Sequence, residues 1–128
     1  MNLTIVMPIL GRPLFTLRAL WYLNLVRCPC RIIVADGSED SNMARILADR
    51  SLFPHLELLH FRRLDVSPNA FLHKCLESVA MVDTPYVQMF ENDDFIFPRS
   101  LQRAVDYLDA NPGYVAAGGA VAGFYLGR

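Results

Sequence analysis

The acidic segment Glu91-Asn92-Asp93-Asp94 is the part of this chain best suited to chemistry. It follows a short apolar run, residues 86–90, and precedes a helix-start signal at Pro98. Mg²⁺ and Mn²⁺ bind one or two protein carboxylates and complete their coordination with water and substrate phosphate oxygens. Paired acids are also common in solvated turns, so the segment alone leaves a metal site and an ordinary loop both open.

Further polar residues follow the ends of the other apolar runs, namely Arg12, Asp36 and the pair Arg62 and Arg63. If these runs are parallel strands, their carboxyl ends lie at one edge of the sheet, where such sheets bind ligands. Carboxylates at that edge can hold a cation or the polar edge of a base or ribose, and arginines can bind phosphate oxygens. This convergence is stronger evidence for a binding site than any single motif.

Apolar runs alternate with helical patterns along the whole chain. The runs cover residues 3–10, 31–35, 56–61 and 86–90, and the helical patterns begin at Pro13, Ser41, Ser67-Pro68 and Pro98. The alternation predicts an α/β fold of three layers, α/β/α, with a mainly parallel sheet. Residues 114–126 are apolar but too few to cross a bilayer, and they are predicted to form a further buried strand. The turn at Asp36-Gly37-Ser38 is expected to use positive φ at its glycine.

Helical spacing predicts which side chains face the core. The predicted inner faces are Leu14, Leu17, Trp21 and Leu25 for the first helix, Met43, Ile46 and Leu47 for the second, Phe71, Leu72, Cys75, Leu76 and Val79 for the third, and Leu101, Ala104, Val105 and Leu108 for the fourth. Ser41 is expected to cap the second helix. Trp21 and Phe71 are thereby interpreted as packing residues.

The composition is that of one globular domain covering residues 1–128. The chain is 53% hydrophobic, with a formal charge of −1 and a pI near 6.3, so it has no broad basic field for nucleic acid or an anionic membrane. No signal peptide is recognisable at the start. Three cysteines cannot all pair, and a lone Cys-Pro-Cys lacks the second ligand pair of a zinc site. Reduced thiols in the cytoplasm are therefore expected.

Several other classes of protein are disfavoured. The glycines at 118, 119 and 123 lack the Lys-Ser or Lys-Thr ending of a phosphate-binding loop, and no Gly-x-Gly-x-x-Gly follows a strand. His55, His60 and His73 show no metal-binding spacing and receive no role. In a phosphorylation receiver domain the acidic pair would follow the first strand, where this chain has Gly11-Arg12.

Four segments resemble the nucleotide-sugar glycosyltransferases of the inverting, family-two type with the GT-A fold. They are Thr4-Ile5-Val6-Met7-Pro8, residues 33–40 with their Asp-Gly-Ser, residues 84–95 with the Asp-x-Asp-like acids, and the helix start at Pro98 and Leu101. The resemblance implies that the chain is the amino-terminal, donor-binding half of such an enzyme, truncated before the acceptor half.

The resemblance also implies roles for individual residues. Donor binding falls to Pro8, Arg12, Asp36, Arg62, Lys74, Glu91 and Asn92, and binding of Mn²⁺ or Mg²⁺ to Asp93, Glu91 and Asp94. Asp36 would accept a hydrogen bond from the nucleobase, commonly uracil. Two departures stand out: Leu10-Gly11-Arg12 replaces a Tyr-Asn-Arg segment whose aromatic stacks on the base, and Ala35 replaces the first acid of Asp-Asp-Gly-Ser.

The expected function is therefore transfer of a sugar from a nucleoside-diphosphate sugar, commonly a UDP-sugar, to an unknown acceptor. The family's general base lies beyond the part that this chain resembles, so no catalytic base is assigned. Two alternatives stay open. One is a non-catalytic nucleotide-sugar binding module, and the other is an assembly domain that forms homo-oligomers through an exposed sheet edge near residues 114–126. The sugar, the acceptor and the stereochemical outcome are not readable.

Overall fold

The computed structural model describes residues 1–40 and 42–123, in which strands and helices alternate. The elements are β1 (Leu3–Ile9), α1 (Pro13–Leu25), β2 (Arg31–Asp36), α2 (Asn42–Ala48), β3 (Glu57–Arg62), α3 (Pro68–Ala80), β4 (Tyr86–Met89) and α4 (Pro98–Ala110). No helix among these residues is long and apolar enough to cross a membrane.

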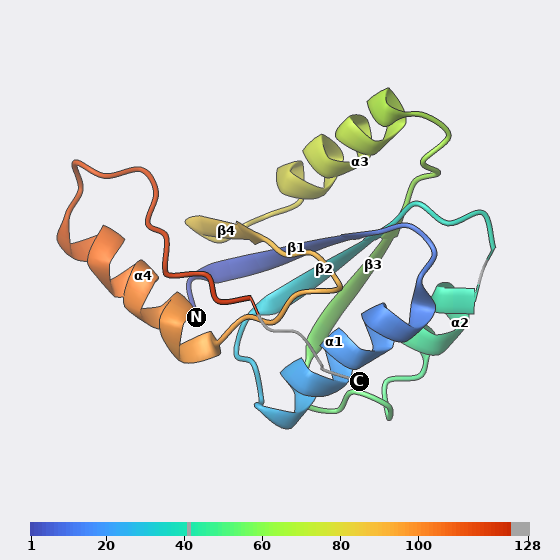
Figure 1. The fold of residues 1–128 in the computed structure, drawn as a ribbon, viewed down its shortest axis with the longest axis horizontal. Helices are drawn as coiled ribbons and strands as arrows, with labels where there is room; N and C mark the ends of the chain where they lie inside the picture. The colour runs from blue at the N-terminus through green and yellow to red at the C-terminus, as the bar shows by residue number, and fades with distance from the viewer. Residues whose placement is uncertain (41, 124–128) are drawn as a thin grey trace.

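The four strands form one parallel sheet in the order β3-β2-β1-β4. Figure 1 shows α3 on one face of the sheet and α1 and α2 on the other, and α4 packs on the same face as α1. The prediction of a three-layer α/β fold is confirmed. From β1 the chain advances sideways to β2 and β3, and then returns to place β4 on the other side of β1. The sheet therefore has a switch point between β1 and β4, the position at which open α/β sheets bind ligands.

The main core lies between the sheet and the helices α1, α2 and α4. Alternate residues of the two central strands point into it, because side chains along a strand alternate between faces. Its buried members include Ile5, Met7, Ile32 and Val34 from the strands, Ala19, Leu20 and Leu23 from α1, Met43 and Leu47 from α2, and Val105 from α4. The predicted inner faces of α2 and α4 are thus confirmed.

The predicted inner face of α1 is wrong. Leu14, Trp21 and Leu25 are exposed and Leu17 is half-buried, whereas the buried residues are Thr16, Ala19, Leu20 and Leu23. Helix α1 is apolar on nearly every side, so periodicity does not single out one stripe. The sheet contacts the stripe that contains the small residues Thr16 and Ala19, which allow a close approach.

The predicted inner face of α3 is also wrong. Phe71, Leu72, Leu76 and Val79 are exposed and Cys75 is half-buried, while the fully buried residues are Lys74 and Ser78. Ser78 Oγ donates to Lys74 O at 2.7 Å, and the Lys74 ammonium is bound by the sheet edge. These two side chains face the sheet, and their burial is tolerated because their polar groups have hydrogen-bond partners. Leu72, Leu76 and Val79 lie on the solvent-exposed side of the helix.

The predicted buried strand at residues 114–126 is wrong as far as it is described. Residues 114–123 form no strand and are exposed, and residues 124–126 lie outside the described residues. Ser41, the predicted cap of α2, also lies outside them. Within the described residues β4 pairs only with β1, so β4 is an edge strand of the sheet, as β3 is on the other side.

Gly37 is required by close packing and not by its backbone angle. Gly37 does not have the expected positive φ. Among the described residues the glycine with a positive φ is Gly11, at 59°. A Cβ at Gly37 would lie 2.2 Å from Asp65 Oδ2 and 2.8 Å from Lys74 Nζ. A glycine therefore lets the loop after β2 lie directly against this pair.

We expect Gly37→Ala to destabilise the protein by about 1–3 kcal/mol, because the new methyl group overlaps a buried carboxylate that cannot move away without losing its partner. The measurement is the free energy of unfolding in urea. Gly113→Ala is the matched control, since a Cβ there meets nothing within 4 Å. Equal unfolding free energies for the two variants would contradict this account of Gly37.

Candidate nucleotide and metal site

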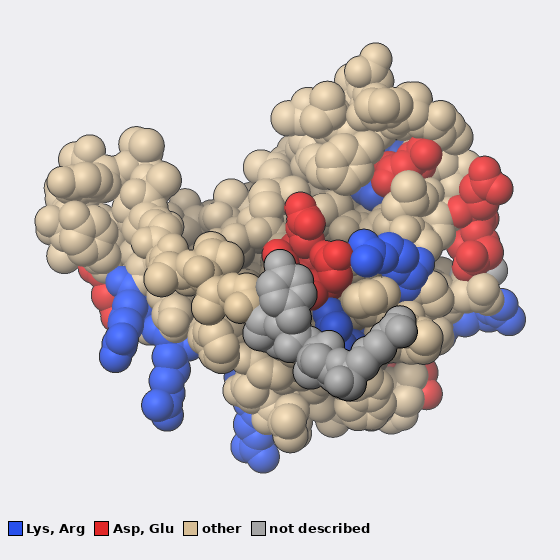
Figure 2. Space-filling view, in the orientation of Figure 1, with Lys and Arg blue, Asp and Glu red and all other residues tan. Residues whose placement is uncertain are grey.

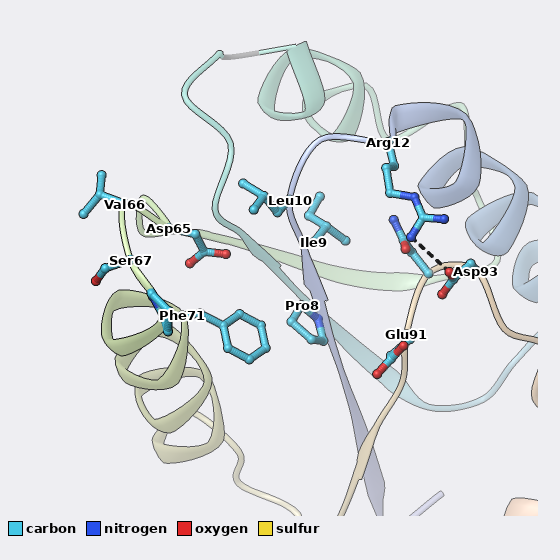
Figure 3. Close-up of a pocket in the computed structure, with 12 residues that line it drawn as sticks. Pro8, Ile9, Leu10, Arg12, Asp65, Val66, Ser67, Phe71, Glu91 and Asp93 are labelled. Atoms are coloured by element: carbon cyan, nitrogen blue, oxygen red, sulfur yellow. Dashed lines mark hydrogen bonds and ion pairs between the residues drawn. The ribbon is translucent and has the colours of Figure 1, made fainter.

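A cavity of about 530 Å³ lies at the carboxyl ends of β1 and β4. This is the switch point of the sheet, and the volume lies in the range of small-molecule sites. Its lining comes from three segments: the end of β1 and the loop after it (Pro8, Ile9, Leu10 and Arg12), the loop before α3 and the first turn of α3 (Asp65, Val66, Ser67, Pro68 and Phe71), and the loop after β4 (Glu91, Asn92 and Asp93). Figure 3 shows the charged residues Arg12, Glu91 and Asp93 at one end and Asp65, Val66 and Phe71 at the other.

The charged end is held in place by α1. Arg12 Nη1 lies 3.0 Å from Asp93 Oδ2, and Arg18 Nη2 donates to Asp93 O at 2.8 Å. The buried side chain of Asn92 donates from Nδ2 to Thr16 Oγ1 at 2.9 Å. The acidic loop is thus fixed through both its backbone and its side chains. Figure 2 shows acidic and basic side chains close together on this face, without a broad field of either sign.

The acids of this end suit a cation that is shared with a ligand. Among the described residues no group of three or more His, Cys, Asp or Glu side chains could hold a metal ion by itself. Mg²⁺ needs no such group, because it usually binds one or two carboxylates together with substrate phosphates and water. Asp93, with Glu91 on the same loop, therefore fits a cation that arrives with a diphosphate.

The other end of the cavity is built on a buried ion pair. Lys74 is fully buried, and its Nζ lies 2.5 Å from Asp65 Oδ2 and donates to Ile9 O at 3.0 Å. The Asp65 side chain is 3% exposed, and its Oδ1 has no hydrogen-bond partner. The ring of Phe71 lies beside this pair, with its centroid 5.4 Å from Lys74 Nζ.

Five of the predicted site residues line the cavity together: Pro8, Arg12, Glu91, Asn92 and Asp93. Asp36, Arg62, Lys74 and Asp94 are at the same edge of the sheet but do not line it. Asp94 is exposed to solvent. Lys74 lies beneath the cavity, where it contacts the lining residues Asp65 and Ile9.

Asp36 and Arg62 make contacts within the protein. Asp36 is fully buried; its Oδ1 accepts from Ser38 N at 2.9 Å and its Oδ2 lies 3.1 Å from His60 Nε2. Arg62 donates to Ser38 O at 3.2 Å and to Glu39 O. Both side chains therefore shape the Ser38 loop, whose Ser38 Oγ accepts from Gly11 N at 3.1 Å. Direct contact of Asp36 with a nucleobase stays a prediction.

Three residues of this edge were missed in the sequence. His60 received no role although it contacts Asp36, and Phe71 was assigned to the core although it lines the cavity. Asp65 was not considered. A signal for Asp65 existed, because it lies between the end of the third predicted strand and the Ser67-Pro68 helix start, in a loop at the ligand-binding edge.

Cys28 and Cys30 precede β2, at the edge of the sheet opposite the cavity. A hydrogen bond from the Cys30 thiol lowers the pKa of Cys28 to about 7, while the same bond and burial raise the pKa of Cys30. Cys30 Sγ also lies 3.4 Å from Met1 Sδ. These thiols are buried in the core, so they are separate from the chemistry of the cavity.

We expect Lys74→Met to destabilise the protein by about 3–5 kcal/mol, because it leaves the carboxylate of Asp65 buried without its cation. Arg63→Met is the control: it breaks a solvent-exposed ion pair with Glu77, worth about 0–1 kcal/mol. Chemical denaturation measures both. If Lys74→Met is no more destabilising than Arg63→Met, the buried pair does not hold this edge.

The architecture of this chain is that of the GT-A glycosyltransferases. A crystal structure of TarS from S. aureus, a family 2-type glycosyltransferase, matches it with a TM-score of 0.65 at 16% identity. A structure of TarS residues 1–349 matches with a TM-score of 0.62 at 15% identity. No protein-family model and no curated protein matches the chain.

The matches cover most of this chain but a minor part of TarS. They include 86% and 88% of this chain, and 20% and 33% of the two TarS chains. At this level of identity the likeness is one of fold. It confirms the predicted GT-A architecture, while activity, donor and metal depend on the residues of the cavity.

Proposed function

We propose that this chain is the donor-binding portion of a glycosyltransferase and holds a nucleoside-diphosphate sugar, with uridine as the nucleoside, together with Mn²⁺ or Mg²⁺. One observation carries the proposal: the cavity at the β1–β4 switch point has acids and an arginine at one end and apolar walls at the other. A nucleoside diphosphate has the matching division, with a flat base at one end and two phosphates at the other.

At the charged end, Arg12 and Asp93 exchange partners on binding. Their ion pair is partly solvent-exposed, with side-chain exposures of 55% and 34%, so opening it costs about 0–1 kcal/mol. The guanidinium of Arg12 then binds the diphosphate with paired N–H groups, and the carboxylate of Asp93 turns to the cation. Glu91 binds a ribose hydroxyl or a water on the cation.

The cation, when bound, neutralises charge that develops on the leaving nucleoside diphosphate. Arg12 adds to this stabilisation from the protein side. These residues are assigned to donor binding, and no residue is assigned as the catalytic base.

An assembly role is the second candidate. One observation favours it: β4 is an edge strand on which Val87 and Met89 are exposed, and α3 leaves Leu72, Leu76 and Val79 exposed as well. Unpaired strand edges next to apolar surface favour pairing between chains. A second copy of the chain is the occupant this candidate requires, because an edge strand is able to pair with its own copy.

We expect isothermal titration to show that uridine diphosphate binds in the presence of Mn²⁺ and much more weakly with a chelator. Mn²⁺ alone should bind weakly, because the protein supplies too few ligands without the phosphates. Asp93→Asn should weaken Mn²⁺-dependent binding by about tenfold or more, since it removes a charged ligand. Asp106→Asn, on the exposed face of α4, is the matched control and should not change it.

Two results would contradict the proposal. Binding that is unchanged in Asp93→Asn would remove the acidic loop from the site. A folded chain that binds neither uridine diphosphate nor Mn²⁺, and sediments as a dimer, would favour the assembly role instead.

A further inference from the structure

The unpaired oxygen of Asp65 marks a second recognition point in the cavity. Among the buried side-chain nitrogen and oxygen atoms of the described residues, Asp65 Oδ1 is the one without a hydrogen-bond partner. Buried carboxylate oxygens are nearly always paired, and leaving one unpaired costs free energy. The other oxygen, Oδ2, is bound to Lys74 Nζ at 2.5 Å, which keeps the carboxylate fixed in orientation.

The surroundings of Asp65 suit a flat ring. Phe71, Val66, Leu10 and Pro8 supply apolar walls at this end of the cavity, and Figure 3 shows the ring of Phe71 turned towards Pro8. Aromatic side chains bind planar bases by stacking. The phosphate-binding residues lie at the far end, so a nucleoside diphosphate would place its base beside Asp65.

We infer that Asp65 and Phe71 form the base-recognition subsite, in which Asp65 Oδ1 accepts the N3–H of uracil while Phe71 stacks on the ring. This inference rests on the proposed function. It answers one departure of the sequence, because Phe71 provides the aromatic that is missing at Leu10. Asp65 in turn offers an acceptor, whereas both oxygens of Asp36 already have partners in the protein.

Access to Oδ1 requires one wall of the cavity to move, because neighbouring atoms cover this oxygen. Val66, which is 77% exposed, and Phe71, which is 40% exposed, are the lining side chains next to it with room to shift. The backbone of the loop stays in place, since Asp65 N donates to Gly37 O at 3.1 Å.

Lys74 sets the polarity of the subsite. An ammonium group only donates hydrogen bonds, so the atom of residue 65 that faces Lys74 must accept. In Asp65→Asn the amide oxygen therefore faces Lys74, and the amide NH₂ occupies the place of Oδ1. A donor replaces the acceptor at the base. The variant should consequently favour cytosine, whose N3 accepts, over uracil, whose N3–H donates.

The test measures the binding of uridine diphosphate, cytidine diphosphate and N3-methyluridine diphosphate with Mn²⁺ by isothermal titration. The wild-type chain should prefer uridine to cytidine diphosphate, and the N3-methyl compound should bind about 10- to 100-fold more weakly, as expected for loss of a specific base contact. Asp65→Asn should invert the uridine-to-cytidine preference. Phe71→Leu should weaken both nucleotides by a similar factor.

The outcomes separate the inference from the function on which it rests. Uridine diphosphate binding that is indifferent to N3-methylation, or an Asp65→Asn variant that keeps the uridine preference, overturns the base subsite and leaves donor binding standing. Failure of a folded wild-type chain to bind any of the three compounds overturns both. Because the N3-methyl compound is tested on the wild type, the inference remains decidable if Asp65→Asn does not fold.

Discussion

A single buried ammonium, that of Lys74, connects the parts of this fold that form its cavity. From α3 it binds Asp65, which follows β3, and the carbonyl of Ile9 at the end of β1. Gly37, which follows β2, packs directly on the pair and donates from its N to Ile9 O at 2.8 Å. Buried ion pairs are costly to break and add little net stability compared with apolar packing. The pair is therefore best understood as a device that fixes position.

The shape of the site follows from that pair. With Lys74 and Ser78 against the sheet, α3 turns Phe71 into the cavity and leaves its other apolar residues on the outside. Because Lys74 binds both Asp65 and Ile9 O, the loop that carries Asp65 lies next to the end of β1. The acids that follow β4 lie at the opposite end of the cavity. One structural contact therefore accounts for both the floor of the cavity and its division into an apolar and a charged half.

The sequence predicted the four strands, their parallel orientation and the convergence of Arg12 with residues 91–93 at one edge of the sheet. Each of these depends on local pattern or on a general rule of sheet topology. It did not predict that Lys74 would be buried, since a lysine on a helix is almost always exposed unless a partner from another element is known. The error at Phe71 followed from this one. The predictions of a buried face on α3 and of a buried strand at residues 114–123 were wrong for a related reason. An apolar pattern indicates burial but does not show which other element would pack against it.

The most direct test of the central claim is the paramagnetic effect of Mn²⁺ on the assigned amide signals of the protein, with and without uridine diphosphate. With the nucleotide, we expect substoichiometric Mn²⁺ to broaden the signals of Arg12, Asn92 and Asp93 first, and to leave those of Cys28 and Cys30 sharp at the opposite edge of the sheet. Without the nucleotide, broadening should be weak. Broadening that is independent of the nucleotide, or that is centred on acids outside the cavity, would contradict the assignment of this cavity as a donor site.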